Sequence, residues 1–254
     1  PALWVKASVD AHLKIPGMES GPWAAALDPY DEGRDKHALV KRKGVVVKYA
    51  DDWSEGDTGD ATRKTVVECR RHIPLDIMYD ATGVGAGVKS EANRLASAKD
   101  PEYGGEPAMP KGMRFIAWNG GSGVLDPDEN ADVSLNDSSE DETGTATTNA
   151  DAFMNRKAQG WWRLRRRFEK TYRVIVKGET YPVDELISLD SKIPKIMELV
   201  TQLSQPTRKK NTGSLKLVVD KTPDGSMSPN LADGTMMVMD PEDGGYVYDW
   251  AAAL

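Results

Sequence analysis

Three aspartates occupy positions from which carboxylates could hold a metal ion. Asp28 ends the apolar run WAAALD, Asp80 ends the apolar run LDIMYD, and Asp233 lies in the first turn of a helix expected after a later strand. Sites form at the carboxyl ends of strands in open α/β sheets, because the loops there leave a crevice. If the two strands are neighbours, Asp28 and Asp80 lie one strand spacing apart, about 5 Å. A divalent cation would relieve the repulsion between such carboxylates, and all-oxygen ligands favour Mg²⁺ or Mn²⁺ over Zn²⁺.

Spacing alone does not separate these aspartates from ordinary ones. The chain has 40 acidic residues, and a single aspartate most often caps a helix or stabilises a turn. His12, His37 and His72 have no spacing typical of a zinc site. Two metal ions about 3.5–4 Å apart at a carboxylate cluster can activate water and stabilise the leaving oxygen of a phosphodiester.

The turn after Asp80, GVGAGV, permits a second interpretation as a phosphate cradle. Its glycines stand at positions 83, 85 and 87, whereas the dinucleotide pattern requires its third glycine or alanine three places after the second, where this chain has Val88. No acidic residue follows about 20 residues later in a second strand, and the chain has no Walker-type GxxxxGK[ST] motif. The cradle therefore remains the weaker alternative.

Hydrophobic periodicity predicts the elements that position these residues. The first half has the order of an α/β sheet: a strand ending at Asp28, two strands around Lys43-Gly44, a helix over TGDATRKTVVECRRH, the strand LDIMYD, a helix after the glycine turn, and the strand MRFIAW. The second half predicts a long helix with an apolar stripe that includes Trp161 and Phe168. It also predicts a shorter helix with Ile193, Ile196, Met197, Val200 and Leu203 on one side, a strand at GSLKLVVD, and a helix over SPNLADGTMMVM capped by Ser228. We expect one compact α/β domain.

Composition fits a globular protein without a membrane span, because no apolar run approaches about 18 residues. No secretory signal is visible at the N-terminus, and the single cysteine, Cys69, excludes an intrachain disulfide, so we expect an intracellular protein with a buried thiol at this position.

The net charge of −7 includes two adjacent segments of opposite charge. Residues 126–151 contain nine acidic and no basic residues, whereas residues 156–177 contain nine basic residues and one acidic. The acidic stretch predicts a surface loop at about residues 120–150, either a solubilising insertion or a screen over the basic face. Arg163, Arg166, Arg167 and Lys170 lie off the apolar stripe and are expected to be exposed, as phosphate contacts or as an ordinary solvated face. The RKK run at residues 208–210 is predicted to be a solvated loop.

Four motifs occur in one order: ALDPYDEGRDKHALVKRKG, IMYDATGVGAGV, AFMNRKAQGWWRLRRRF and SPNLADGTMM. This set resembles the C-terminal nuclease domain of tailed-phage terminase large subunits, from about residue 23 to residue 239. The resemblance implies a ribonuclease-H-like mixed sheet flanked by helices, with a loop-rich acidic insertion, over residues 23–254. Residues 1–22 would be a lead-in segment from an ATPase domain that precedes Pro1 in a longer chain.

The resemblance also implies a function and a site. Such domains are endonucleases that cut concatemeric double-stranded DNA during genome packaging, with two Mg²⁺ or Mn²⁺ ions. Asp28, Asp80 and Asp233 would be catalytic metal ligands, and Asp35 and Lys221 auxiliaries, with Asp31 and Asp220 as further acidic candidates. Portal protein, the small terminase subunit and DNA would be partners, in the cytoplasm of an infected bacterium.

Two departures from the family pattern concern the ligands. Gly234 stands where the family usually has alanine, which predicts a frayed or more mobile helix. Asp80 stands where some relatives have glutamate, and its shorter side chain requires the metal to lie closer. Three alternatives stay open: a ribonuclease-H-like resolvase or integrase, a nucleotide-binding regulatory module using the GVGAGV turn, and a non-catalytic adaptor that docks on DNA.

Overall fold

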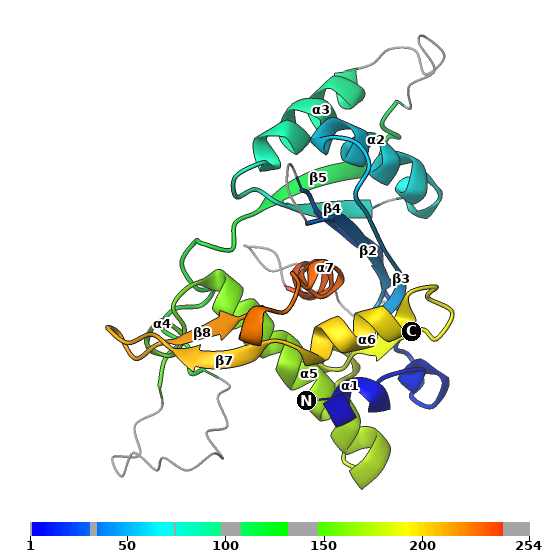
Figure 1. The fold of residues 1–254 in the computed structure, drawn as a ribbon. Helices are drawn as coiled ribbons and strands as arrows, with labels where there is room; N and C mark the ends of the chain where they lie inside the picture. Colours follow the sequence, from blue (N-terminus) through cyan, green and yellow to red (C-terminus); the bar gives the residue numbers. More distant parts are fainter. Residues whose placement is uncertain (1, 31–34, 74, 98–107, 132–146, 241–254) are drawn as a thin grey trace.

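A mixed six-stranded sheet forms the centre of the protein (Figure 1). The computed structural model describes residues 2–30, 35–73, 75–97, 108–131 and 147–240. The sheet has the order β5-β4-β1-β2-β3-β6. Its strands are β1 (Trp23–Asp28), β2 (His37–Lys43), β3 (Val46–Trp53), β4 (Leu75–Asp80), β5 (Met113–Trp118) and β6 (Ser188–Leu189). Strands β1, β4 and β5 are parallel, and β2 is antiparallel to both β1 and β3. The predicted α/β class is confirmed.

Helices cover both faces of this sheet, as Figure 1 shows. They are α1 (Ala2–Ala7), α2 (Thr58–Cys69), α3 (Gly85–Ser97), α4 (Asn149–Ala152), α5 (Arg156–Lys177), α6 (Ile196–Ser204) and α7 (Asn230–Met239), with short 3₁₀ turns η1 (Ala11–Leu13), η2 (Arg70–His72), η3 (Val183–Glu185) and η4 (Pro223–Gly225). Helices α2 and α3 lie on one face, and α7 lies on the other, between the sheet and α5.

Alternation along β1 divides the core into two layers. Ala25 and Leu27 belong to the cluster under α2 and α3, whereas Ala24 and Ala26 belong to the cluster under α7 and α5. Successive side chains of a strand point to opposite faces, so every second residue of β1 faces α7. The alanines on that face leave room for α7, whose ten residues are all buried.

Close packing of α7 also explains its glycine. A Cβ atom added to Gly234 would lie 2.8 Å from Cγ2 of Val40 on β2, so glycine at this position lets the helix approach the sheet. The helix is continuous through Gly234, and the fraying expected from the missing alanine does not occur.

Three local predictions are wrong. Helix α7 begins at Asn230 with Pro229 as its N-cap, so Ser228 does not cap it. The RKK run is part of strand β7 (Thr207–Lys210), which forms a two-stranded hairpin with β8 (Leu217–Asp220). Met197 is 71% exposed and not on the apolar side of α6, whereas Ile193, Val200 and Leu203 are buried as expected. Spacing alone does not show which residue at the edge of an apolar stripe faces solvent, and in α6 that residue is Met197.

Residues 2–22 are packed into the same unit. Val5, Ala11 and Met18 are buried in the core cluster on the α5 side, and Val9 pairs with Leu189 beside β6. The origin of this lead-in segment in a preceding domain stays a prediction. Of the acidic stretch, residues 132–146 lie outside the described residues. Cys69 is buried as expected, and in the described residues no helix is long and apolar enough to cross a membrane.

Candidate metal centre

Strands β1 and β4 end side by side and present two carboxylates on one face. They are parallel neighbours, with Ala26 opposite Met78 and Leu27 opposite Tyr79. Asp28 and Asp80 follow two residues after Ala26 and Met78, both of which belong to the cluster under α7. Alternation therefore places both carboxylates on the α7 face. The predicted adjacency of the two strands is confirmed.

Helix α7, which packs on the same face of the sheet, supplies the third carboxylate. Asp233 lies in its first turn and is only 3% exposed. The position of this turn is fixed by Gln202 of α6, whose Oε1 accepts hydrogen bonds from the backbone N–H groups of Leu231 (2.8 Å) and Ala232 (3.3 Å). Such a side chain satisfies N–H groups that the start of a helix leaves unpaired. Asp233 is thus held on the same face as Asp28 and Asp80.

Asp35, predicted as an auxiliary, anchors the same helix. Its Oδ1 accepts a 2.6 Å hydrogen bond from Nδ2 of Asn230, the first residue of α7. This contact gives Asp35 a positioning role for α7 in the described structure.

Electrostatics show that the carboxylates of Asp233 and Asp80 act on the carboxyl of Asp28. Burial raises the pKa of Asp28 well above its usual range, and the neighbouring charges of Asp233 and Asp80 raise it further. Lys157 and Lys221 act in the opposite direction on Asp28. Concentrated negative charge in a poorly hydrated place destabilises the ionised carboxylate unless a cation lies nearby.

Two lysines supply positive charge beside Asp233. Lys221 forms an ion pair with Oδ2 of Asp233, and Nζ of Lys157 lies 3.8 Å from Oδ1. Oδ1 of Asp233 is buried and has no hydrogen-bond partner. An orphaned buried oxygen beside two further carboxylates is a donor set that fits a hard divalent cation.

As they stand, the three carboxylates are too far apart to share a single ion. Among the described residues, the trio of acidic or histidine ligands with atoms all within 4.8 Å of one another is Asp10, His12 and Asp190, at a different place. A cation held by Asp28, Asp80 and Asp233 therefore requires their side chains to move closer and Lys221 to leave Oδ2 of Asp233.

Comparison with solved structures finds the same architecture. The nuclease domain of the large terminase subunit gp2 of bacterial virus Sf6 matches with a TM-score of 0.78 and 27% identity, covering 96% of this chain and 98% of that one. A lysine-to-alanine variant of that domain with manganese and beta-thujaplicinol matches with a TM-score of 0.77 and 26% identity, over 96% and 98% of the two chains. Over nearly its whole length, this chain is therefore similar in structure to the nuclease domain of a terminase large subunit.

Other comparisons agree with this assignment only at the level of the fold. The large terminase nuclease of thermophilic phage G20c, with bound magnesium, matches with a TM-score of 0.50 and 8% identity, over 89% of this chain and 82% of that one. No protein-family model matches the sequence, and no curated protein matches it. The ribonuclease-H-like mixed sheet predicted for the terminase family is confirmed.

In the terminase fold of this chain, the glycine turn serves packing. Gly83 has a positive φ of 67°. A Cβ atom on Gly85 would lie 2.4 Å from the carbonyl oxygen of Asp80, and one on Gly87 would lie 2.2 Å from Oγ1 of Thr58 on α2. These glycines let α3 begin directly after the metal-site strand and pack against α2.

Lys157 is the site residue that the sequence analysis missed. It lies in the first turn of α5, and three contacts in register align this helix with α7: Lys157 with Asp233, Gly160 with Met236, and Arg163 with Asp240. The signal was present in RKAQGWW, which belongs to a family motif, but nothing local links that lysine to a distant aspartate. Lys221, by contrast, is named by the sequence analysis, and the structure pairs it with Asp233; its role as an auxiliary stays a prediction.

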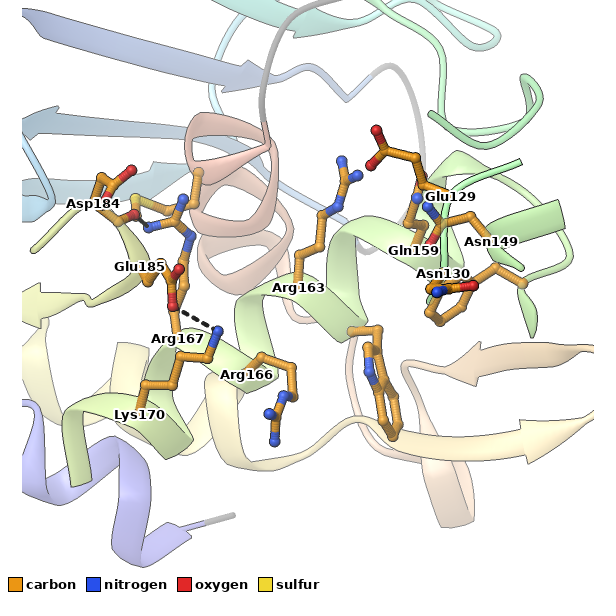
Figure 2. A pocket seen from close by; sticks show the side chains of 13 residues that line it. Glu129, Asn130, Asn149, Gln159, Arg163, Arg166, Arg167, Lys170, Asp184 and Glu185 are labelled. Carbon is orange, nitrogen blue, oxygen red and sulfur yellow. Dashed lines mark hydrogen bonds and ion pairs between the residues drawn. The ribbon is translucent and has the colours of Figure 1, made fainter. Parts of the chain in front are cut away.

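The four basic residues predicted to be exposed on α5 are half-buried. Arg163, Arg166, Arg167 and Lys170 line a pocket of about 360 Å³ beside the end of α7 (Figure 2). The Arg167 guanidinium donates to the carbonyl oxygens of Asp184 and Leu186, and Lys170 lies 2.8 Å from Glu185. Helical periodicity places the four residues off the apolar stripe, but it cannot show that the segment after α5 returns to contact Arg167 and Lys170. Their role in DNA binding stays a prediction.

The remaining acidic candidates lie elsewhere or are not described. Asp220, at the end of β8, pairs with Lys209 of the hairpin. Asp31 lies outside the described residues. Neither contributes a described contact to the carboxylate cluster.

Proposed function

We propose that this chain is a metal-dependent endonuclease that cuts double-stranded DNA during phage genome packaging. The observation that carries the proposal is the convergence of Asp28, Asp80 and Asp233 on one face of a ribonuclease-H-like sheet, from two strand ends and one helix. Similarity to the Sf6 terminase nuclease over nearly the whole chain supports it. The catalytic cations would be Mg²⁺ or Mn²⁺, since the donor set is entirely oxygen.

The three aspartates would hold the cations, and the surrounding structure fixes the position of each. Asp28 and Asp80 are fixed by the pairing of β1 with β4, and Asp233 by the buried helix α7. A pair of ions there would activate water for in-line attack on the phosphodiester and stabilise the departing 3′ oxygen. The two-metal form of this chemistry is part of the proposal.

Lys221 and Lys157 would keep the carboxylate cluster compact and then neutralise the scissile phosphate. Both ammonium groups lie against Asp233, and both offset the charge repulsion felt by Asp28. On arrival of the cations, Lys221 would turn from Asp233 toward the negatively charged DNA backbone, since a lysine is a flexible point charge with three donors.

The packaging role implies a set of partners and a place. In that role DNA is the substrate, and the portal protein, the small terminase subunit and an ATPase domain in the same full-length chain would present it. The cytoplasm of an infected bacterium would be the site of action. A recombination nuclease would prefer branched DNA, whereas the packaging nuclease is expected to cut linear duplex without that preference.

Plasmid cleavage tests the proposal. Supercoiled plasmid is incubated with the chain in Mn²⁺, in Mg²⁺ and in EDTA, beside Asp80→Asn. Asp76→Asn is the matched control, because Asp76 lies on the same strand and pairs with the exposed Arg114 of the neighbouring edge strand β5. We expect metal-dependent cutting that Asp80→Asn abolishes and Asp76→Asn retains. Equal cutting by wild type and Asp80→Asn would overturn the assignment of the site.

A further inference from the structure

A second cluster of potential metal ligands lies where the N-terminal segment joins the far edge of the sheet. One ligand atom each of Asp10, His12 and Asp190 lies within 4.8 Å of the others. Backbone pairing brings these residues together: the N–H of Asp10 donates to Leu189 O (2.8 Å), and the N–H of Leu189 donates to Ser8 O (3.0 Å). The cluster is therefore built by a connection that extends the sheet beyond β6.

This cluster is separate from the carboxylates of the catalytic face. It adjoins β6, which is three strands away from β1 in the sheet order. Neighbouring strands lie about 4.8 Å apart, so the two places are roughly 14 Å apart across the sheet. A single ion cannot serve both.

Hydrogen bonds orient His12 as a ligand. The Ser188 hydroxyl donates to the carbonyl oxygen of Ser8 (3.2 Å), and its oxygen accepts from the backbone N–H of His12 (3.1 Å). Nδ1 of His12 lies 2.9 Å from the same oxygen. Since the one hydroxyl proton is directed to Ser8, Nδ1 carries a proton and donates it to Ser188. Nε2 is left with its lone pair, in the arrangement that metal-binding histidines use.

The surroundings of the His12 ring carry more acidic than basic side chains. Besides Asp10 and Asp190, Oε1 of Glu19 lies 3.8 Å from Nε2. Lys48 is the described cation that pairs with this group, at 2.8 Å from Glu19 and 2.6 Å from Asp190. Three carboxylates thus face the ammonium of Lys48, with Lys43 acting on Glu19 as a further positive charge, and a divalent cation would offset the negative charge that remains.

We propose that Asp10, His12 and Asp190 bind a divalent transition-metal ion that fastens the N-terminal segment to the β6 edge of the sheet. An imidazole nitrogen with carboxylate oxygens favours Zn²⁺, Co²⁺ or Mn²⁺ over Mg²⁺, which takes oxygen ligands. Bonds of about 2.0–2.2 Å to such an ion require the three ligand atoms to close in slightly. An open pocket of about 550 Å³ beside His12 and Glu19 gives the ion a route from solvent.

Co²⁺ titration of the tag-free chain in the Asp80→Asn background tests this site. Excess Mg²⁺ is present throughout to occupy the oxygen-only site, and visible absorption reports the histidine-bound Co²⁺. Further variants carry His12→Gln, Asp10→Asn or Ser188→Ala, with His72→Gln as the matched control because His72 packs on Trp23 instead. Melting without added metal shows that each variant is folded.

We expect one Co²⁺ absorption band in the parent, and a rise in melting temperature with Zn²⁺. His12→Gln and Asp10→Asn should abolish both, His72→Gln should retain both, and Ser188→Ala should weaken binding roughly 10–100-fold, as loss of an orienting partner does elsewhere. The proposal fails if the parent shows no band in excess Mg²⁺, or if His12→Gln and Asp10→Asn bind Co²⁺ as the parent does. Asp10 is half-exposed, so its variant tests the site even if the more buried Ser188 variant unfolds.

Discussion

Substituting Gly234 by alanine should destabilise the domain, although alanine is the better helix former. Alanine in a helix interior is favoured over glycine by about 1 kcal/mol. The added Cβ, however, would lie 2.8 Å from Cγ2 of Val40, a fully buried β-branched residue on β2 with no room to rotate away. Overpacking of this kind costs about 1–3 kcal/mol. The net expectation is a loss of about 0–2 kcal/mol in the free energy of unfolding.

A second substitution, Val40→Ala, should reverse the sign of the effect that Gly234→Ala has on stability. Val40→Ala removes the obstructing methyl at its own cost of about 2 kcal/mol, from two buried carbon groups and the cavity left behind. In that background, Gly234→Ala should become stabilising by about 1 kcal/mol, because only the helix preference remains. The coupling between the two substitutions is then about 1–3 kcal/mol, well above the error of additivity.

Urea unfolding of the four proteins measures this coupling directly. Gly160→Ala is the matched control, since its Cβ would meet Sδ of Met236 at 2.7 Å, and an unbranched thioether side chain can move aside. That control should cost less than Gly234→Ala. If Gly234→Ala stabilises the wild type as much as it stabilises Val40→Ala, the explanation of the glycine by close packing of α7 is wrong.

Three further predictions follow from the contacts around the site and the core. Lys221→Met should bind Mn²⁺ several-fold more tightly by calorimetry but cleave plasmid more slowly, because the lysine both competes for Asp233 and would neutralise the substrate; unchanged affinity would contradict the competition. Arg156→Met should lower the free energy of unfolding by up to about 3–5 kcal/mol, because the buried Asp240 carboxylate loses the cation 2.8 Å away and keeps only Trp118 and the more distant Arg163, and Arg156→Met with Asp240→Asn should recover part of that loss; a silent Arg156→Met would refute the role of the pair. Burial opposes ionisation of Asp52, but hydrogen bonds from Lys195 and Lys36 outweigh it and lower the pKa of Asp52. Its stabilisation is therefore present above its unfolded pKa of about 3.9 and lost as pH falls through the lower folded value, so Asp52→Asn should flatten the fall of melting temperature between about pH 5 and pH 2; an equally steep fall in the variant would contradict this.

The sheet, and the placement of two of the three proposed metal ligands on one face of it, could be predicted because their signals are local. Apolar runs that end in aspartate identify β1 and β4, and a two-residue period fixes which face each carboxylate shares. The third, Asp233, required the family motif, since one aspartate in a first helical turn is ordinarily a cap. The spacing of the glycines in the turn disfavours a phosphate cradle, and the structure adds the close contacts that Gly85 and Gly87 permit.

The parts that were not predicted depend on segments far apart in the sequence. Lys157 reaches Asp233 only because α5 and α7 pack side by side, and Gln202 satisfies the start of α7 from another helix. Arg167 and Lys170 of α5 are less exposed than expected because residues 184–186 contact them. Periodicity describes one element at a time and carries no information about such encounters.

The most direct test of the central claim is the position of bound metal. A crystal of the chain soaked in Mn²⁺ and measured at a wavelength where manganese scatters anomalously would show where the ion lies. The account predicts anomalous density between the carboxylates of Asp28, Asp80 and Asp233, with Lys221 turned away from Asp233. Density that is absent there, with the Lys221–Asp233 pair intact at saturating Mn²⁺, would contradict the assignment of these three aspartates as the catalytic metal ligands.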